Sequence, residues 1–94
     1  MYRVKSSKQF VKSLNKLLKN GIKQKYVDEI YEVIDVLSKG KRLHTKYEDH
    51  KLQGEWSGYR ECHIQGDLLL IYEIDGNELI LVLINIGSHA QLFG

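Results

Sequence analysis

Three histidines and one aspartate are the side chains of this sequence whose types and spacing best suit chemistry. His50 stands in a polar stretch, and His89 follows the last apolar segment of the chain. His63 lies in a segment typical of a strand, four residues before Asp67. Imidazole can accept or donate a proton near neutral pH, because its unperturbed pKa is about 6.5. If the segments that carry them form adjacent antiparallel strands, the four residues are expected to converge on one face.

Such a cluster suits the cleavage of RNA, because RNA carries its own nucleophile, the 2′-hydroxyl. A base must take that proton and an acid must protonate the leaving 5′-oxygen, so no metal is required. Asp67 could orient a histidine or accept a proton, and Arg60 could stabilise charge that grows on the phosphate. Two alternatives stay open on the residues alone: ordinary surface histidines, which we expect of His44, and a three-histidine metal site.

The basic residues are unevenly distributed along the chain. Residues 1–27 contain eight basic residues and no acid, whereas residues 28–94 contain six basic and twelve acidic residues, a net charge of −6. Four lysines recur every three or four residues opposite the apolar stripe of a predicted helix: Lys8, Lys12, Lys16 and Lys19. This row predicts contact with RNA phosphates, which would position the protein without recognising sequence. A solvated helix exterior is the alternative.

The length of 94 residues predicts one domain, residues 1–94, of the α+β class. Two N-terminal helices are expected to pack on a small, mainly antiparallel sheet in the order β-α-α-β-β-β. The first helix follows an N-cap at Ser6 or Ser7 and ends near Gly21. The sequence Asp75-Gly76-Asn77 predicts a hairpin turn. The other expected elements are a strand over Tyr2–Val4, a helix over Lys25–Ser38, a polar loop over 41–54, and strands over Trp56–Ile64, Leu68–Ile74 and Leu79–Ile86.

The number of cysteines and the hydropathy of the sequence indicate the cellular compartment of the protein. Cys62 is the single cysteine, which precludes an internal disulfide and is typical of a reducing cytosol. Strand alternation directs its side chain away from the face of His63, so we expect it in the core. No apolar run approaches the roughly 20 residues that span a bilayer. We therefore expect a cytoplasmic protein with no membrane partner.

Four segments resemble one family of bacterial proteins. They are residues 49–54 (DHKLQG), 56–63 (WSGYRECH), 67–72 (DLLLIY) and 87–94 (GSHAQLFG). Together they resemble the YafQ branch of the RelE/ParE toxin superfamily, and the resemblance covers nearly the whole chain. It implies a RelE-like fold and a toxin of a type II toxin–antitoxin pair. It also implies an enzyme that enters the ribosomal A site, contacts ribosomal RNA, cuts mRNA without a metal or other cofactor, and is silenced by a cognate antitoxin.

The resemblance also implies roles for particular residues. His50, His63, Asp67, His89 and Phe93 match family active-site positions. His89 is implied as the general acid, and Asp67 with His50 or His63 as the basic side. Phe93 is implied to stack on or position a base, with a core position as its alternative. Glu61 stands where some relatives have aspartate, which implies a supporting, substrate-binding role.

A different function is compatible with the same fold. ParE-like toxins inhibit DNA gyrase without enzymatic activity, and fold alone does not separate the two functions. The histidine set favours the nuclease, because a gyrase-binding module has no need of it. An inactive RNA-binding module is a further alternative.

Overall fold

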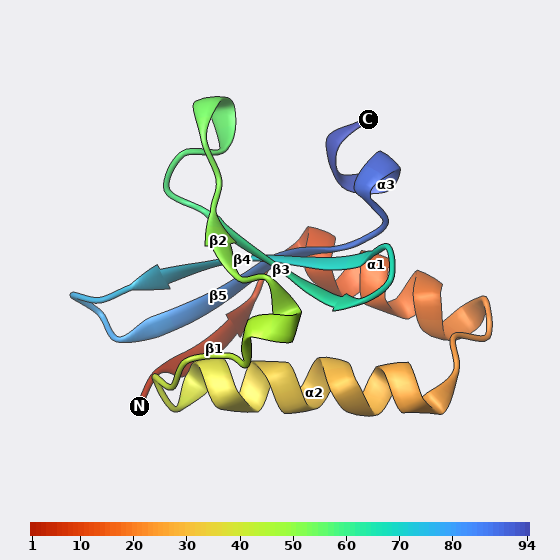
Figure 1. The fold of residues 1–94 in the computed structure, drawn as a ribbon, viewed down its shortest axis with the longest axis horizontal. Helices are drawn as coiled ribbons and strands as arrows, with labels where there is room; N and C mark the ends of the chain where they lie inside the picture. Colours follow the sequence, from red (N-terminus) through yellow and green to blue (C-terminus); the bar gives the residue numbers. More distant parts are fainter.

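The computed structural model describes residues 1–94, which form a five-stranded sheet with helices on both faces (Figure 1). The strand order is β1-β5-β4-β3-β2. Neighbouring strands are antiparallel except β1 and β5, which run parallel, so the sheet is mixed but mainly antiparallel, as expected. The strands are β1 (Arg3–Ser6), β2 (His50–Lys51), β3 (Arg60–Gln65), β4 (Leu68–Asp75) and β5 (Ile80–Gly87).

Helices α1 (Lys8–Lys19) and α2 (Gln24–Ser38) cover one face of the sheet. The predicted cap at Ser7 is confirmed, since its hydroxyl accepts the N–H of Phe10 at 2.9 Å. The main core lies between these helices and the sheet. It includes Phe10, Ile30, Val33, Leu37, Cys62, Ile64, Leu70, Tyr72, Leu81, Leu83 and Ile86. Cys62 is completely buried there, as its place in the strand predicted. No helix has the length and apolar character needed to cross a membrane.

The second face of the sheet carries a smaller apolar cluster under a C-terminal helix, α3 (His89–Phe93). Leu69 and Ile71 of β4 are buried against Leu92 of this helix. Trp56 and Phe93 pack at the edge of the same cluster. A capping box begins α3: the Ser88 hydroxyl accepts the N–H of residue 91, and the side chain of residue 91 accepts the N–H of Ser88. This short helix was not expected from the sequence, because five residues are too few to establish a helical period.

Two further differences concern the segment before β3. The predicted loop over 41–54 contains the short 3-10 helix η1 (Thr45–Tyr47), the strand β2 and the start of a second 3-10 helix, η2 (Gly54–Trp56). A strand of two residues has no alternation to detect. The strand predicted from Trp56 begins only at Arg60, because Gly58 turns the chain at a φ of 99°. The predicted hairpin after β4 is confirmed, and the Asp75 carboxylate accepts the N–H of Asn77 at 3.0 Å.

Candidate active site

Strand register gathers the predicted residues on the second face of the sheet. His50 of β2 pairs with Glu61 of β3, and His63 stands two residues further along β3. Directly paired residues, and residues two apart on one strand, have side chains on the same face. His63 also pairs with Leu69, which pairs with Gly87 at the end of β5. This row places Gly87, two residues before α3, two strand spacings from His63, or about 10 Å.

Glu61 is the centre of the first cluster. Its Oε1 lies 3.3 Å from Nε2 of His63 and 3.7 Å from Nε2 of His50. The two imidazole rings are 6.3 Å apart between centroids. Glu61 is only 5% exposed and is the single charged residue among the buried ones. A buried carboxylate needs a donor that offsets its desolvation, and Nε2 of His63 is the nearer of the two ring nitrogens beside it.

Glu48 completes this cluster from the loop before β2. Its backbone is left-handed, at a φ of 49°, which turns its carbonyl toward His50. The carbonyl lies 2.6 Å from Nδ1 of His50 and can only accept, so Nδ1 carries the proton. In the neutral ring Nε2 is then the free proton acceptor. The Glu48 carboxylate lies 3.6 Å from Nδ1 of His63, so His63 has a carboxylate at each ring nitrogen.

The second cluster is built on α3. Asp67, in the turn between β3 and β4, accepts the backbone N–H of His89 at 3.2 Å and so holds the first residue of the helix. The His89 ring packs on Phe93 at 5.1 Å, and Phe93 meets the edge of Trp56 at 5.4 Å. Phe93 is half-buried and His89 is exposed, so the imidazole is supported on one side and open on the other. The structure thus brings the predicted residues together as two clusters that border one face.

Arg60 is not brought to the histidines. It precedes Glu61 on β3, so its side chain lies on the opposite side of the strand. Its Nη2 donates to Asp49 at 2.9 Å, and its Nε donates to the Tyr72 hydroxyl at 3.2 Å. Tyr72 in turn donates to Asp49. The hydrogen bond to Asp49 raises the pKa of Arg60. The pKa of Tyr72 is also raised, mainly by burial and secondly by the hydrogen bond to Asp49. This network fixes the loop that carries Glu48 and His50.

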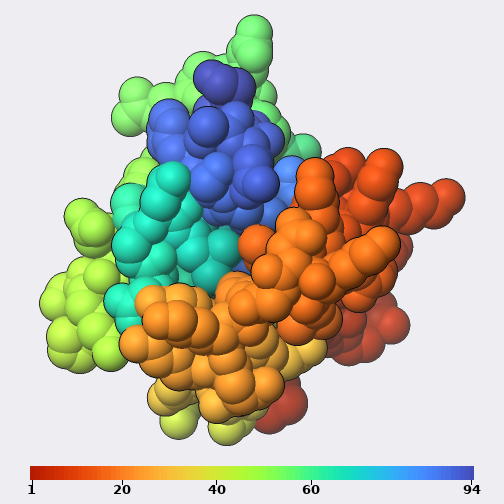
Figure 2. Space-filling view, turned by 90° about the vertical axis from the view of Figure 1, so that its right-hand side faces the viewer, coloured from red at the N-terminus to blue at the C-terminus, as the bar shows by residue number.

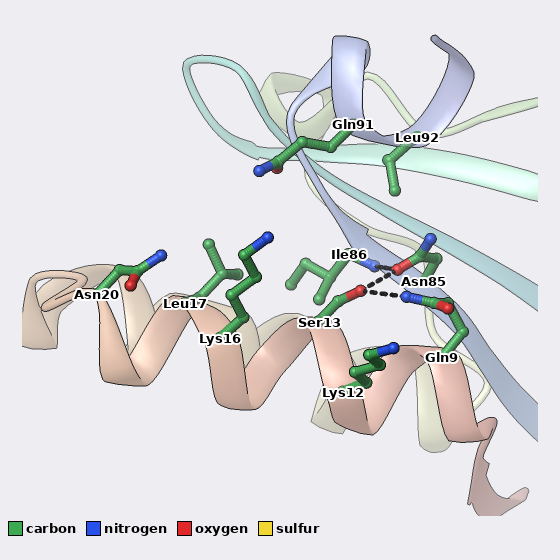
Figure 3. Close-up of a pocket in the computed structure, with 10 residues that line it drawn as sticks. All are labelled: Gln9, Lys12, Ser13, Lys16, Leu17, Asn20, Asn85, Ile86, Gln91 and Leu92. Carbon is green, nitrogen blue, oxygen red and sulfur yellow. Dashed lines mark hydrogen bonds between the residues drawn. The ribbon is translucent and has the colours of Figure 1, made fainter.

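The predicted lysine row is exposed along α1, and none of its members forms an ion pair. Lys12 and Lys16 border a groove between α1, β5 and α3 (Figures 2 and 3). His44 is exposed, as expected, and its Nδ1 accepts the N–H of Lys46 at 3.0 Å. Sequence reasoning missed Glu48, which belongs to none of the motifs. Trp56, which starts the strand predicted from the sequence, instead lies before β3 and packs its ring against Phe93.

The chain contains no group of three or more His, Cys, Asp or Glu side chains disposed to hold a metal ion. That cleavage proceeds without a metal or other cofactor stays a prediction.

The overall architecture matches solved toxin structures. A metal-bound toxin from Helicobacter pylori superimposes with a TM-score of 0.87 and 42% identity, covering 99% of this chain and 100% of that one. The YafQ toxin in the Escherichia coli DinJ–YafQ complex superimposes with a TM-score of 0.86 and 30% identity, covering all of both chains. The fold is therefore that of a bacterial toxin of this structural class.

Sequence relatives narrow the class to one family. The family model described as "Bacterial toxin of type II toxin-antitoxin system, YafQ" matches residues 2–94. A putative toxin YafQ from Haemophilus influenzae is 42% identical over 98 residues, covering 96% of this chain and 92% of the relative. The mRNA interferase toxin YafQ of Escherichia coli K12 is 44% identical over 52 residues, about half of each chain (55% and 54%). The chain belongs to the YafQ family of type II toxin–antitoxin toxins, as its motifs predicted.

Proposed function

We propose that this toxin is an endoribonuclease that cuts mRNA in the ribosomal A site by histidine acid–base catalysis, with the RNA 2′-hydroxyl as nucleophile and no metal. The observation that carries the proposal is the Glu61 carboxylate buried between the Nε2 atoms of His50 and His63, on the sheet face that α3 borders. The relative named mRNA interferase toxin YafQ supports the same activity. The matches to YafQ toxins do not favour the gyrase-binding alternative.

His50 is the general base of the proposed reaction. Its Nδ1 proton is held by the Glu48 carbonyl, which leaves Nε2 free to take the 2′-hydroxyl proton. The Glu61 carboxylate faces the His50 imidazolium that then forms, and the carboxylate offsets the new positive charge.

His63 has a different role, because carboxylates face both of its ring nitrogens. Carboxylates placed in this way can balance the charge of the ring when both of its nitrogens carry protons. As an imidazolium it stabilises the negative charge that grows on the phosphate oxygens in the transition state. This separation of roles between two neighbouring imidazoles follows from their different hydrogen-bond partners.

His89 is the general acid that protonates the leaving 5′-oxygen. The 2′-oxygen forms a bond to phosphorus as the bond to the 5′-oxygen breaks, which yields a 2′,3′-cyclic phosphate and a 5′-hydroxyl. Asp67 acts through His89: its contact with the His89 N–H positions α3. Phe93 supports the His89 ring and offers its remaining face to a base of the substrate.

The proposed partners are mRNA, the ribosome and a cognate antitoxin. The row Lys8, Lys12, Lys16 and Lys19 is exposed and free of acidic partners, which suits contact with ribosomal RNA phosphates. The likeness to YafQ in the DinJ–YafQ complex supports an antitoxin partner. These partners fit a toxin that acts in the cytoplasm.

The test is the mapping of mRNA 5′ ends after induction of the toxin, with the parent compared with His89→Ala. The parent is expected to produce new ends within translated codons and to arrest growth. His89→Ala is expected to produce neither, while its affinity for the antitoxin stays unchanged. An equally toxic His89→Ala variant would contradict the catalytic proposal. Cleavage by purified components should also persist in excess EDTA, and its loss there would favour a metal site.

A further inference from the structure

A groove of about 380 Å³ lies between α1, the end of β5 and α3, and none of its lining residues is a histidine (Figures 2 and 3). Three of its ten lining residues are hydrophobic and the other seven are polar. The lining residues are Gln9, Lys12, Ser13, Lys16, Leu17, Asn20, Asn85, Ile86, Gln91 and Leu92. None of these is acidic, although the chain contains 12 Asp and Glu residues. The absence of carboxylates and the presence of two lysines give the groove a positive potential.

The amide of Asn85 is oriented by the protein so that its donor is left for a ligand. Its Oδ1 accepts the Ser13 hydroxyl at 2.7 Å and the N–H of Ile86 at 2.8 Å (Figure 3). An amide oxygen with two donors is fully engaged, and this fixes which end of the amide is the NH₂ group. No group of the protein accepts from that nitrogen.

Gln91 is oriented in the same way from the opposite wall. Its Oε1 accepts the N–H of Ser88 at 2.8 Å in the capping box of α3. A Cβ at position 87 would lie 2.8 Å from the same oxygen, so Gly87 allows the side chain to pack closely there. The Gln91 NH₂ group therefore has no protein partner and borders the groove.

Two preset amide donors and two unpaired ammonium groups form a site for an anion with several acceptor oxygens. We propose that this groove binds a phosphodiester of the RNA strand, held by the amide nitrogens of Asn85 and Gln91 and by Lys12 and Lys16. The inference rests on the proposed nuclease function. RNA is favoured as the occupant because Gln91 belongs to the same five-residue helix as His89 and Phe93, so a strand cut beside His89 passes the end of that helix.

The test uses isosteric substitutions that keep every structural hydrogen bond. Asn85→Asp and Gln91→Glu retain the accepting oxygen but replace the NH₂ donor with a second, negatively charged oxygen. Affinity for a 2′-O-methyl octanucleotide, which cannot be cleaved, is measured by fluorescence anisotropy at several salt concentrations. Each variant is expected to weaken binding about tenfold. The plot of the logarithm of the association constant against the logarithm of the salt concentration has a negative slope, and its magnitude should fall by about 0.7 for each phosphate that the variant no longer binds. Asn77→Asp, the same charge change in the distant β4–β5 turn, is the matched control and should leave affinity within twofold of the parent.

An abasic oligomer with the same number of phosphates separates phosphate from base recognition. It is expected to retain the sensitivity to Asn85→Asp and Gln91→Glu, and to shift the side-chain NH₂ resonances of both residues in NMR spectra of the parent. Equal binding by the two groove variants and Asn77→Asp would overturn the inference. The inference would also be overturned if the groove variants bound the base-containing oligomer more weakly than Asn77→Asp does but bound the abasic oligomer equally well. A loss of affinity for the antitoxin, with no loss of affinity for either oligomer, would overturn it too.

The test of the groove and the test of the nuclease activity can fail independently of each other. Binding of an uncleavable strand does not require chemistry, so the affinity of the groove variants can be measured whether or not the protein cuts RNA. Loss of cleavage by His89→Ala tests the nuclease, whereas loss of affinity in the groove variants tests the groove.

Discussion

Oε1 of Glu61 lies 3.3 Å from Nε2 of His63, and this carboxylate is almost completely buried. Glu61→Gln keeps the shape of the side chain and removes its charge, so a protonated His50 loses its carboxylate partner and a protonated His63 loses the nearer of its two. We expect the cleavage rate to fall about a hundredfold, a typical contribution of acid–base machinery. Single-turnover cleavage of translated mRNA measures the effect, and circular dichroism verifies that the variant is folded.

Glu48→Gln is the matched comparison. The Glu48 side chain is 69% exposed, and its contact with His50 is made by the backbone carbonyl, which the substitution keeps. Its charge is therefore screened by solvent, and we expect a rate within about threefold of the parent. If Glu48→Gln slowed cleavage as much as Glu61→Gln, burial would not be what gives Glu61 its role.

Asp67 is predicted to act as an acceptor and not as a base. Asp67→Asn retains an oxygen that can accept the His89 N–H, whereas Asp67→Ala does not. We expect Asp67→Asn to keep activity within about threefold, and Asp67→Ala to reduce it about tenfold or more because the general acid is displaced. The two rates are measured at saturating substrate. Equal, severe losses of activity in both variants would instead assign proton transfer to this carboxylate.

The Asp49–Arg60–Tyr72 network is predicted to stabilise the loop before β2. Asp49→Ala removes the common acceptor of both donors, and we expect the free energy of unfolding to fall by about 2 kcal/mol. Urea denaturation at pH 7 gives this value. A change below about 0.5 kcal/mol would mean that water replaces Asp49 without cost.

Tyr72→Phe tests the same network through pH. Burial raises the pKa of Tyr72, so the folded state holds the phenol proton more tightly than the unfolded state does. The stability that this provides is fully present below the ordinary pKa of 10 and is lost as the pH rises through the raised value. The difference in unfolding free energy between the parent and Tyr72→Phe is therefore expected to shrink above pH 10. A difference that grows with pH would contradict the raised pKa.

Cys62 is predicted to be chemically inert in the folded protein. It is completely buried, and burial raises the pKa of its thiol, so the reactive thiolate is scarce at neutral pH. Labelling with a disulfide reagent should be negligible in buffer and stoichiometric in denaturing urea. Rapid labelling of the native protein would indicate that the main core opens readily.

Much of the fold could be predicted because its long elements carry clear periods. The apolar spacing of α1 and α2, the Ser7 cap and the turn at Asp75 each have a local cause in the sequence. The two-residue strand β2 and the five-residue helix α3 have none, since they depend on pairing with β3 and on packing over Leu69.

The sequence predicted which residues form the site, but it did not predict which of their side chains contact one another. The histidines were identifiable by type and motif, but their partners are set by register and side-chain direction across strands. Arg60 illustrates this: it stands beside Glu61 in sequence, yet strand alternation sends it to Asp49 on the other side. Glu48 contributes mainly through a backbone carbonyl, which residue type does not reveal.

Attack by the 2′-hydroxyl under histidine acid–base catalysis can be tested by a single-atom change in the substrate. A translated mRNA is prepared with a 2′-deoxynucleotide at the mapped cleavage position, and the fragments are compared with those of the unmodified message. We expect 5′-hydroxyl and 2′,3′-cyclic phosphate ends on the unmodified message and no cleavage at the deoxy position. Cleavage that persists there, or fragments with 5′-phosphate ends, would contradict the proposed mechanism.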